Sequence, residues 1–382
     1  MKVVIQAASV GPTSRGAGKY TQQLLPHLLP ILKEAGCEVT VLLRRGMDLN
    51  LPAHLAKVIY SPQIPNRRVA RLLLEEVWPA CITWGKDIFL STDSRFPVSP
   101  IWAKKKLVVV HDILILRHLA DPSQFPVDAS PADLKYFSMG MRKALRRADS
   151  ITTVSQSTAS ELVSFAGVKR DRISVIPDGI DHERFYPLGD NARLEEVRSR
   201  YHLPLAFYLF VGQPSKQKNL PLIVESYASG KLPGEFRLPV VITWDLRRQT
   251  LFKDSLAGTN DAGVFGLFQF TGYVRDEDLP FVYAAARALI YPSRYEGFGL
   301  PPLEAMACGT PVICSNITSL PEVVGDAALL IDPEQPGSLT EAICRVNDEP
   351  TRKDLVVRGL KRAKAFSWES TARQLAQQIL LK

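Results

Sequence analysis

Cysteine is scarce in this sequence, and no two cysteines form a pattern that would bind a metal. Five cysteines are scattered over 382 residues, and none belongs to a C-x-x-C pair. Zinc sites usually begin with such a pair, and small secreted domains hold many paired cysteines. The pattern therefore indicates reduced thiols, and we expect a cytoplasmic protein.

Long apolar runs are also missing. No stretch of about 18 consecutive apolar residues, the length that spans a bilayer, occurs in the sequence, so we expect no transmembrane helix. The first residues pass directly into the strand pattern of residues 2–7 and lack the hydrophobic region of a signal peptide. We therefore expect no secretory leader.

An excess of positive charge is absent from the second half of the chain and present in the first. Residues 1–180 hold 24 Lys and Arg against 15 Asp and Glu, whereas residues 181–382 hold 23 against 24. The surplus is either a solvated basic face or a surface that attracts an anionic membrane. Because no zinc finger or RNA-binding aromatic motif accompanies it, we expect no nucleic-acid partner.

Patterns of buried strands alternate with helical patterns. Apolar runs typical of buried strands occur at residues 2–7, 38–43, 106–110 and 207–212. Such alternation predicts parallel, doubly wound sheets in the α/β class. A chain of 382 residues is long for one core and predicts two domains.

Residues 287–313 form the most informative stretch. An apolar strand pattern is followed by Gly297 and Gly299, which leave a loop that can approach a ligand closely. Pro301 and Pro302 then suit the first turn of a helix, which needs no N–H donors there. The helix N-terminus would face the loop, and such an N-terminus favours a phosphate group.

Two carboxylates lie eight residues apart in this stretch, Glu296 in the loop and Glu304 in the helix. On spacing alone, Glu304 could be a dipole partner in the first helical turn and Glu296 a solvated loop residue. The whole string resembles the E-x7-E signature of the retaining GT-B glycosyltransferases of family 4. This resemblance implies that Glu296 contacts the transferred sugar and that Glu304 binds the ribose hydroxyls of the nucleotide.

The resemblance also implies a domain organisation. Members of this family have the GT-B fold, two Rossmann-like doubly wound domains that face each other across a cleft. We assign residues 1–186 to an N-terminal acceptor-binding domain and residues 187–367 to a nucleotide-sugar-binding domain. The final helix, residues 368–382, is expected to pack back on the first domain.

The loop before Tyr20 matches neither common phosphate-binding pattern. A Walker A motif would need glycine at Thr13 and Ser or Thr at Tyr20, and the dinucleotide motif would need glycine at Thr21. The loop resembles the glycine-rich start of family 4, where the backbone approaches the donor diphosphate or the acceptor. This makes Gly16 and Gly18 candidates, although the loop alone would indicate an ordinary strand-to-helix turn.

The predicted strand at 106–110 ends at His111 and Asp112. The carboxyl end of a strand is where an open α/β sheet places its ligand, although a lone histidine there is more often structural. The segment resembles the H-D-(L/I) segment of bacterial mannosyl- and deoxysugar-transferases. That resemblance implies that His111 lies beside the donor sugar and that Asp112 orients it or touches the acceptor.

The loop at residues 213–219 follows the first strand of the second domain. In family 4 a lysine before an asparagine neutralises the donor diphosphate, and Lys218 matches it; lysine is a compact charge suited to phosphate. Gln213 and Gln217 stand where many members have arginine. A second positive charge beside the diphosphate is therefore in doubt, unless Lys216 supplies it.

Further candidates follow from the same resemblance. Gly272 belongs to a turn whose backbone lies near the nucleotide base. Asp276 and Asp278 form a D-x-D pair, which binds a metal in GT-A enzymes, but they lie at a predicted helix start, where acids complement the dipole. We therefore expect no metal. The candidate donor-binding residues are Gly16, Gly18, Gln213, Lys218, Gly272, Glu296, Gly297, Phe298, Gly299, Leu300 and Glu304, the catalytic ones are Glu296, His111 and Lys218, and Asp112 is on the acceptor side.

The resemblance implies a retaining, metal-independent hexosyltransferase without a cofactor, because the nucleotide sugar is its substrate. We expect mannose to pass from GDP-mannose to a hydroxyl of a glycan or lipid-linked acceptor in the synthesis of a surface polysaccharide or glycolipid. A UDP-sugar donor, a sugar-phosphate synthase and a non-catalytic nucleotide-sugar-binding subunit are the alternatives. No paired nucleophile and acid is evident, so we expect attack on the face that the diphosphate leaves, assisted by positive groups.

Overall fold

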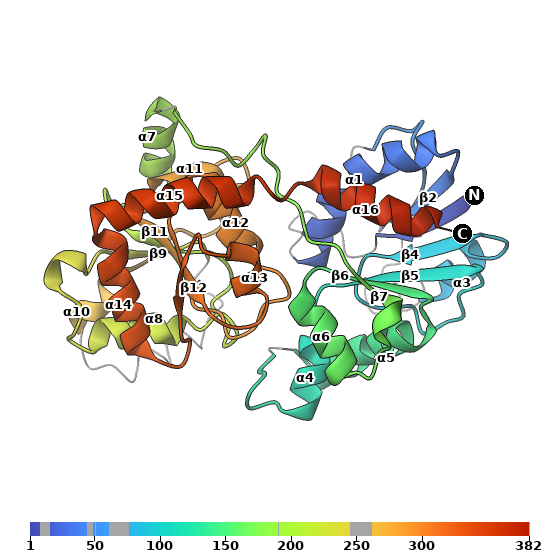
Figure 1. Cartoon of the computed structure of the whole chain (residues 1–382), viewed down its shortest axis with the longest axis horizontal. Coiled ribbons are helices and arrows are strands. Elements are labelled where there is room, and N and C mark those ends of the chain that lie inside the picture. The colour runs from blue at the N-terminus through green and yellow to red at the C-terminus, as the bar shows by residue number, and fades with distance from the viewer. Residues whose placement is uncertain are drawn as a thin grey trace. The chain divides into compact units, whose positions relative to one another are not determined.

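The computed structural model divides the chain into two compact units (Figure 1). The first comprises Met1–Ala120, Ala129–Gly179 and Ser367–Lys382, and the second comprises Asp121–Asp128 and Ile180–Phe366. The residues that the structure describes are 1–7, 16–43, 49, 51–60, 76–127, 129–189, 191–244 and 262–381.

The first unit is built on a parallel sheet with the order β3-β2-β1-β4-β5-β6-β7. Its strands are β1 (Lys2–Gln6), β2 (Glu38–Leu43), β3 (Lys57–Tyr60), β4 (Ile88–Ser91), β5 (Lys105–Val110), β6 (Ser150–Thr153) and β7 (Ile173–Val175). The strands predicted at 2–7, 38–43 and 106–110 are thereby confirmed. The order reverses between β1 and β4, which is the point where doubly wound sheets bind their ligands.

Helices cover this sheet and bury its apolar residues. They are α1 (Ala17–Glu34), α3 (Trp78–Ile82), α4 (Leu114–Ala120), α5 (Pro131–Arg147), α6 (Gln156–Ser164) and α16 (Trp368–Leu380), with a short 3-10 segment at Arg170–Arg172. α16 packs along α1, and Thr371 Oγ1 donates a hydrogen bond to the carbonyl of Pro177 (2.7 Å) (Figure 1). The C-terminal helix therefore belongs to the first unit.

The border between the units differs from the one expected at residue 186. The second unit already begins at Ile180, because the following segment packs on its helices. The ring of Phe185 lies 6.1 Å from that of Tyr283, and Arg184 forms an ion pair with Asp276 (3.5 Å). At Gly179 the backbone passes so close to the start of α16 that an added Cβ would lie 2.1 Å from the Trp368 nitrogen.

The second unit holds a parallel sheet with the order β10-β9-β8-β11-β12-β13. Its strands are β8 (Tyr208–Phe210), β9 (Val240–Ile242), β10 (Phe268–Phe270), β11 (Ala288–Tyr291), β12 (Val312–Ser315) and β13 (Leu329–Ile331). Its helices are α7 (Asn191–Arg200), α8 (Leu220–Ala228), α10 (Ala262–Phe265), α11 (Leu279–Ala285), α12 (Leu300–Ala307), α13 (Leu320–Val324), α14 (Pro336–Asn347) and α15 (Glu349–Ala363), with a 3-10 segment at Gly234–Phe236. The strand–loop–helix–strand unit predicted at 287–313 is confirmed as β11, α12 and β12.

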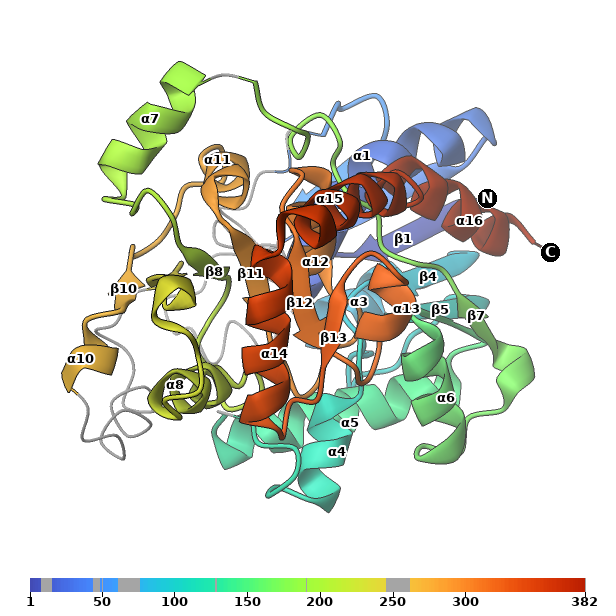
Figure 2. The same ribbon diagram turned by 60° about the vertical axis from the view of Figure 1, so that its left-hand side comes forward.

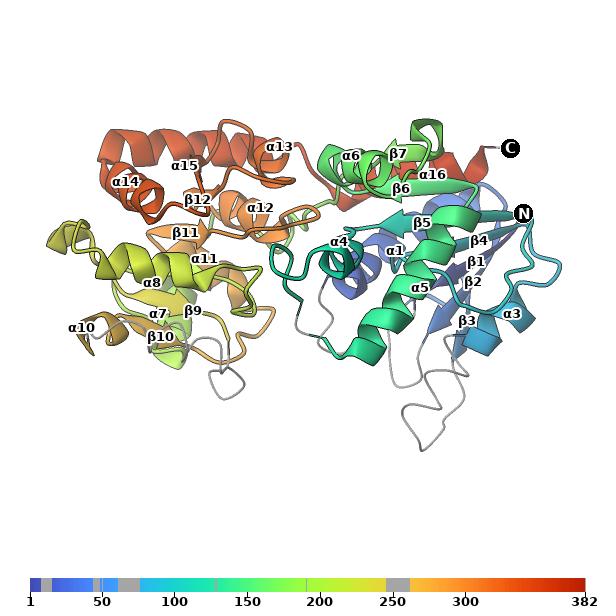
Figure 3. The ribbon, with the colours of Figure 1, turned by 90° about the horizontal axis from the view of Figure 1, so that it is seen from below.

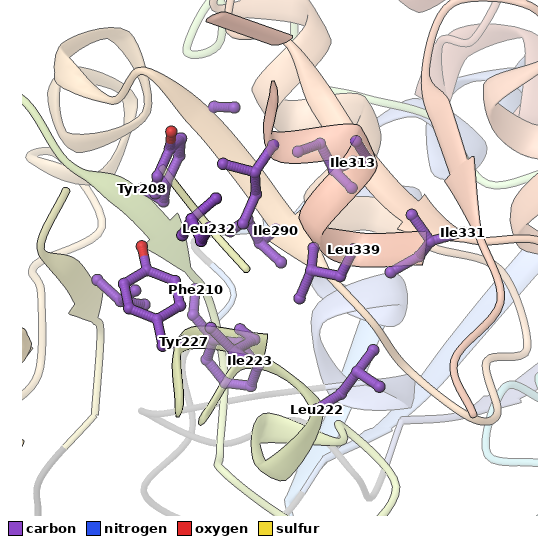
Figure 4. Packing of buried hydrophobic residues seen from close by; sticks show 14 of the residues in the cluster. Tyr208, Phe210, Leu222, Ile223, Tyr227, Leu232, Ile290, Ile313, Ile331 and Leu339 are labelled. Atoms are coloured by element: carbon purple, nitrogen blue, oxygen red, sulfur yellow. The ribbon is translucent and has the colours of Figure 1, made fainter. Parts of the chain in front are cut away.

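The core of this unit fixes the loops that follow β8 and β11. α8 packs beside α14 (Figure 2), and both bury apolar side chains against the sheet. The buried cluster in Figure 4 includes Tyr208, Phe210, Leu222, Ile223, Ile290, Ile313 and Leu339. Because α8 begins directly after the loop at 211–219, burial of its apolar face also anchors that loop. In the described ranges, every helix is too short or too polar to cross a lipid bilayer.

Candidate active site

Two adjacent strands of the second unit bring Lys218 and Glu296 together. β8 and β11 pair in parallel, so the loops that follow them leave the same edge of the sheet. The Nζ of Lys218 lies 2.6 Å from Oε1 of Glu296, and the two side chains are only 19% and 12% exposed. The sequence predicted both residues at one site, and the structure places them in direct contact.

Tyr291, the last residue of β11, completes this contact. Its hydroxyl donates a hydrogen bond to Oε1 of Glu296 (2.9 Å) and accepts one from Lys218 Nζ, which also lies 4.5 Å from the ring centroid. Burial, together with the Glu296 carboxylate, raises the pKa of Tyr291 well above its ordinary value. The hydroxyl therefore stays protonated and holds the acid and the lysine in one geometry.

The loop that carries Glu296 is held from the start of α13. Ser319 Oγ contacts the carbonyl oxygens of Glu296 (3.0 Å) and Phe298 (2.6 Å). Gly299 has φ +124°, and a Cβ there would lie 2.8 Å from the side chain of Leu320. This position therefore requires glycine, and Leu300 can begin α12 directly behind the loop.

Phe298 and Gly297 occupy different environments within the same loop. The side chain of Phe298 is buried, with its ring 5.9 Å from that of Phe366. Gly297 is half-buried beside Glu296. A contact from Phe298 to a donor would thus come from its backbone, because its ring belongs to the core.

Glu304 is buried in α12, four residues after Leu300. It lies beyond the first turn, so it is not the first-turn dipole partner that spacing alone would allow. Its Oε2 accepts a hydrogen bond from Tyr283 (2.8 Å). Burial, with Glu304 nearby, raises the pKa of that tyrosine well above its ordinary value, so Tyr283 remains a donor.

Gln217, which stands where many members of family 4 have arginine, joins the two loops. Its side-chain Nε2 donates a hydrogen bond to the backbone carbonyl of Tyr295 (2.6 Å). The backbone carbonyl of Gln217 accepts one from the backbone N–H of Arg294 (2.8 Å). Gln213 and Lys216, in contrast, are exposed. The loop after β8 therefore directs Lys218 inward and leaves these two polar side chains toward solvent.

Asp278, one acid of the D-x-D pair, is fully buried and engaged by cations. Its carboxylate accepts from Arg193 (2.9 Å), Arg200 (2.6 Å) and Arg275 (2.9 Å). Such a carboxylate organises the start of α11. Gly272, just beyond β10, has φ +76° and open space where a side chain would lie.

His111 follows β5 at the carboxyl edge of the first sheet. Its Nε2 lies 2.9 Å from the carbonyl oxygen of Thr92, and its ring lies 4.7 Å from that of Tyr20 in an edge-to-face arrangement. A carbonyl only accepts, so Nε2 carries the proton, and burial lowers the pKa of His111. The neutral ring therefore presents Nδ1 as an acceptor. Asp112 Oδ1 accepts the N–H of Leu114 (2.9 Å) and caps α4.

The glycine-rich loop of the first unit is described only where it meets α1. Gly16, with φ +52°, precedes the helix, and Gly18 is buried in its first turn. Residues 8–15, including Thr13, lie outside the described residues. The candidates therefore form two groups, one with Gly16 and His111 in the first unit and one with Lys218 and Glu296 in the second.

Comparisons of the sequence with known proteins identify the family. The model of Glycosyltransferase Family 4 matches residues 14–184, and that of Glycosyl transferases group 1 matches residues 202–362. O-antigen chain mannosyltransferase B of Escherichia coli is 35% identical over 277 residues, which cover 71% of this chain and 69% of that protein. This chain belongs to glycosyltransferase family 4.

Other relatives of this family 4 glycosyltransferase differ in length. Serotype-specific mannosyltransferase WbdA of Escherichia coli is 30% identical over 276 residues, which cover 70% of this chain but 32% of WbdA. The chain thus spans about a third of that relative. WaaG, a glycosyltransferase involved in lipopolysaccharide biosynthesis, matches over 100% of both chains with a TM-score of 0.74 at 16% identity. HepE of Anabaena, solved with UDP and glucose, matches over 99% of both chains with a TM-score of 0.73 at 18% identity. The expected GT-B fold of two parallel-sheet units is thereby confirmed.

The family 4 motifs led to most of these residues but not to Tyr291. Its position as the last residue of the strand before Glu296 was the available signal, because a side chain at a strand's carboxyl end lies at the ligand edge. Tyr283 gave no such signal, since it lies in α11, 21 residues before its partner Glu304.

Proposed function

We propose that this family 4 glycosyltransferase transfers a hexose with retention of the anomeric configuration. The observation that carries the proposal is the pairing of Lys218 with Glu296 at the carboxyl ends of β8 and β11, in front of α12. A cation and a carboxylate at one point suit the two halves of a nucleotide sugar, which are an anionic diphosphate and a polyhydroxylated ring.

Loss of the diphosphate builds negative charge on the leaving group. Lys218 would balance it together with the N-terminus of α12, whose free N–H groups carry partial positive charge. These groups supply the electrostatic stabilisation that a metal supplies in other transferases, so we propose metal-independent transfer. No cofactor is required, because the nucleotide sugar is a substrate.

Glu296 would position the sugar once Lys218 turns to the diphosphate. Its Oε1 would exchange the lysine for a sugar hydroxyl while Tyr291 keeps hold of the same oxygen. Glu304 would accept the ribose hydroxyls, and His111 would accept a sugar hydroxyl at Nδ1. The acceptor hydroxyl would attack from the leaving-group side and pass its proton to the departing phosphate oxygen, which retains the configuration.

GDP-mannose is the proposed donor, and a glycan or lipid-linked sugar is the proposed acceptor. The support is the similarity to O-antigen chain mannosyltransferase B and to WbdA, which are named as mannosyltransferases. We place the reaction in the cytoplasm, in the synthesis of a surface polysaccharide such as lipopolysaccharide. The basic surplus of residues 1–180 supports a peripheral contact with an anionic membrane and is not accompanied by a nucleic-acid-binding motif.

A donor panel tests this proposal. Purified protein is mixed with GDP-mannose, UDP-glucose, UDP-N-acetylglucosamine or UDP-galactose, with and without EDTA, and both the melting temperature and nucleoside diphosphate release are measured. We expect a selective shift and EDTA-insensitive release with GDP-mannose. With a mannose-terminated oligosaccharide added as acceptor, we expect an α-linked product by NMR. Selective release from a UDP-sugar would overturn the donor, inverted product would overturn retention, and binding without turnover would favour a non-catalytic subunit.

A further inference from the structure

Two indole rings lie side by side on the surface of the first unit. Trp84 is 71% exposed and Trp102 is 52% exposed, with their ring centroids 5.5 Å apart in an edge-to-face arrangement. Tryptophan is normally covered by protein, because its ring offers a large apolar area. Two exposed tryptophans that contact each other therefore indicate a surface that binds another molecule or a membrane.

Backbone contacts hold this pair in place. Thr83, which is fully buried, accepts the N–H of Trp102 at its Oγ1 (3.1 Å) and the N–H of Lys86 at its carbonyl (3.2 Å). The N–H of Lys104 in turn donates to the carbonyl of Lys86 (3.2 Å). These hydrogen bonds join the segment before β4 to the segment before β5 and hold the backbone that carries the two indole rings.

Two lysines lie close to the tryptophans in the sequence. Lys86 is two residues after Trp84, and Lys104, whose side chain is 79% exposed, is two residues after Trp102. The next lysine, Lys105, instead donates from its Nζ to the carbonyl of Leu381 (2.8 Å). Asp87 accepts from Lys104 (2.9 Å) and offsets one of these charges. Protein interfaces are depleted in lysine, whereas anionic lipid headgroups attract it and tryptophan concentrates at the boundary between headgroups and acyl chains. This composition therefore favours a lipid surface over a protein partner.

The pair lies at the end of the sheet opposite to the candidate site. Trp102 precedes β5 and His111 follows it, so the strand, about 17 Å long by its six residues, separates them. Figure 3 shows α3, which precedes Trp84, at the end of the first sheet near the N-terminus and α4, which follows His111, at the other end. The two indole rings therefore do not belong to the candidate active site.

We propose that Trp84 and Trp102, with Lys86 and Lys104, form a docking surface for an anionic lipid bilayer. The proposal deepens the membrane contact proposed above and depends on it. The indoles would enter the headgroup region while the lysines contact lipid phosphates. The ligand edge of the first sheet would then point away from the bilayer, which suits an acceptor whose reactive end extends from the membrane.

Vesicle flotation tests the docking surface. The full chain is floated with vesicles of phosphatidylethanolamine and phosphatidylglycerol, or with phosphatidylcholine alone. We expect binding to the anionic vesicles to fall at least about tenfold in Trp84→Ser/Trp102→Ser, because two apolar anchors are lost. Leu205→Ser, at a residue 86% exposed in the second unit, should bind like the parent chain. Equal flotation of the Trp84/Trp102 variant and the parent would overturn the proposal, as would absence of flotation.

Two further readouts separate this surface from catalysis and from other occupants. Lipids brominated along their acyl chains should quench the fluorescence of the parent chain but not of Trp84→Phe/Trp102→Phe. Nucleoside diphosphate release should be the same in the serine double variant and the parent. If neither releases nucleoside diphosphate, the proposed function is contradicted, but binding to vesicles can still be measured. A dimer that forms only while both tryptophans are present, without flotation, would assign the surface to a second copy and overturn the lipid proposal.

Discussion

The Nζ of Lys218 lies 2.6 Å from Oε1 of Glu296, so the residue proposed to bind the phosphate and the residue proposed to bind the sugar form an ion pair with each other. Both come from loops at the carboxyl ends of neighbouring strands. Removing one partner leaves the other charge partly buried and unbalanced, which costs more than the loss of an exposed pair. This contact is therefore the most direct place to test the mechanism.

Lys218→Ala should lower kcat for nucleoside diphosphate release by about 10²–10³, the usual cost of one lost donor at a developing anion. Lys216→Ala is the matched control, because Lys216 is exposed in the same loop. Steady-state kinetics with the donor found in the panel provides the measurement. An equal loss in both variants would mean that the loop, rather than the Lys218 charge, is what matters.

Tyr291→Phe should lower kcat by about tenfold, which corresponds to one hydrogen bond to a charged group. The donor KM should change little, because Tyr291 acts through Glu296 and Lys218 and does not itself hold the donor. Tyr186→Phe, which removes an exposed hydroxyl, should leave both constants unchanged. If Tyr291→Phe raised KM and left kcat intact, Tyr291 would be a binding residue and not a positioning one.

Glycine substitutions at three positions test whether the loop before α12 requires glycine at residue 299. Gly299→Ala combines a positive φ with a 2.8 Å approach to Leu320 and should reduce the free energy of unfolding by about 3 kcal/mol. Gly272→Ala has the positive φ with open space around it, and should cost about 1 kcal/mol. Gly337→Ala, inside α14, should be neutral or stabilising.

Urea denaturation of the three variants gives these energies. The informative result is the order, with the Gly299 variant least stable and the Gly337 variant most stable. If the Gly272 and Gly299 variants lost the same stability, the contact with Leu320 would contribute nothing, and strain alone would explain both.

The sequence was sufficient for the fold and for the residues that lie where strands end. Lys218, Glu296 and His111 each follow a strand whose apolar pattern is clear, and parallel strands bring their carboxyl ends to one edge. Residues that act across long sequence separations were not predictable in this way. Tyr283 reaches Glu304 from another helix, and Gln217 takes a structural role that only its contact with the carbonyl of Tyr295 reveals.

The border between the units was misplaced for a related reason. Residues 187–200 are polar and highly charged, but a border between units is set by packing and not by composition. Phe185 contacts Tyr283, and Gly179 lies against the start of α16, so the chain changes unit between these two points. Local composition does not encode either contact.

Asp178, just before that border, should make the stability of the protein depend on pH. The carboxyl is buried, its Oδ1 has no hydrogen-bond partner in the described structure, and burial raises its pKa well above 3.8. Between 3.8 and the raised pKa the folded state binds more protons than the unfolded state, so the free energy of unfolding falls as pH rises through that window. Asparagine has the same shape and stays neutral throughout.

Asp178→Asn should therefore raise the melting temperature, and the gain should grow as pH rises above about 4, because the parent chain loses the contribution of this carboxyl until the pH passes its raised pKa. Differential scanning fluorimetry across this range measures the effect. Asp171→Asn removes the same charge from an exposed position and should show no gain that grows with pH. A constant difference between Asp178→Asn and the parent would mean that the carboxyl ionises in the folded protein as freely as in the unfolded chain, and that its burial is relieved by a partner such as bound water.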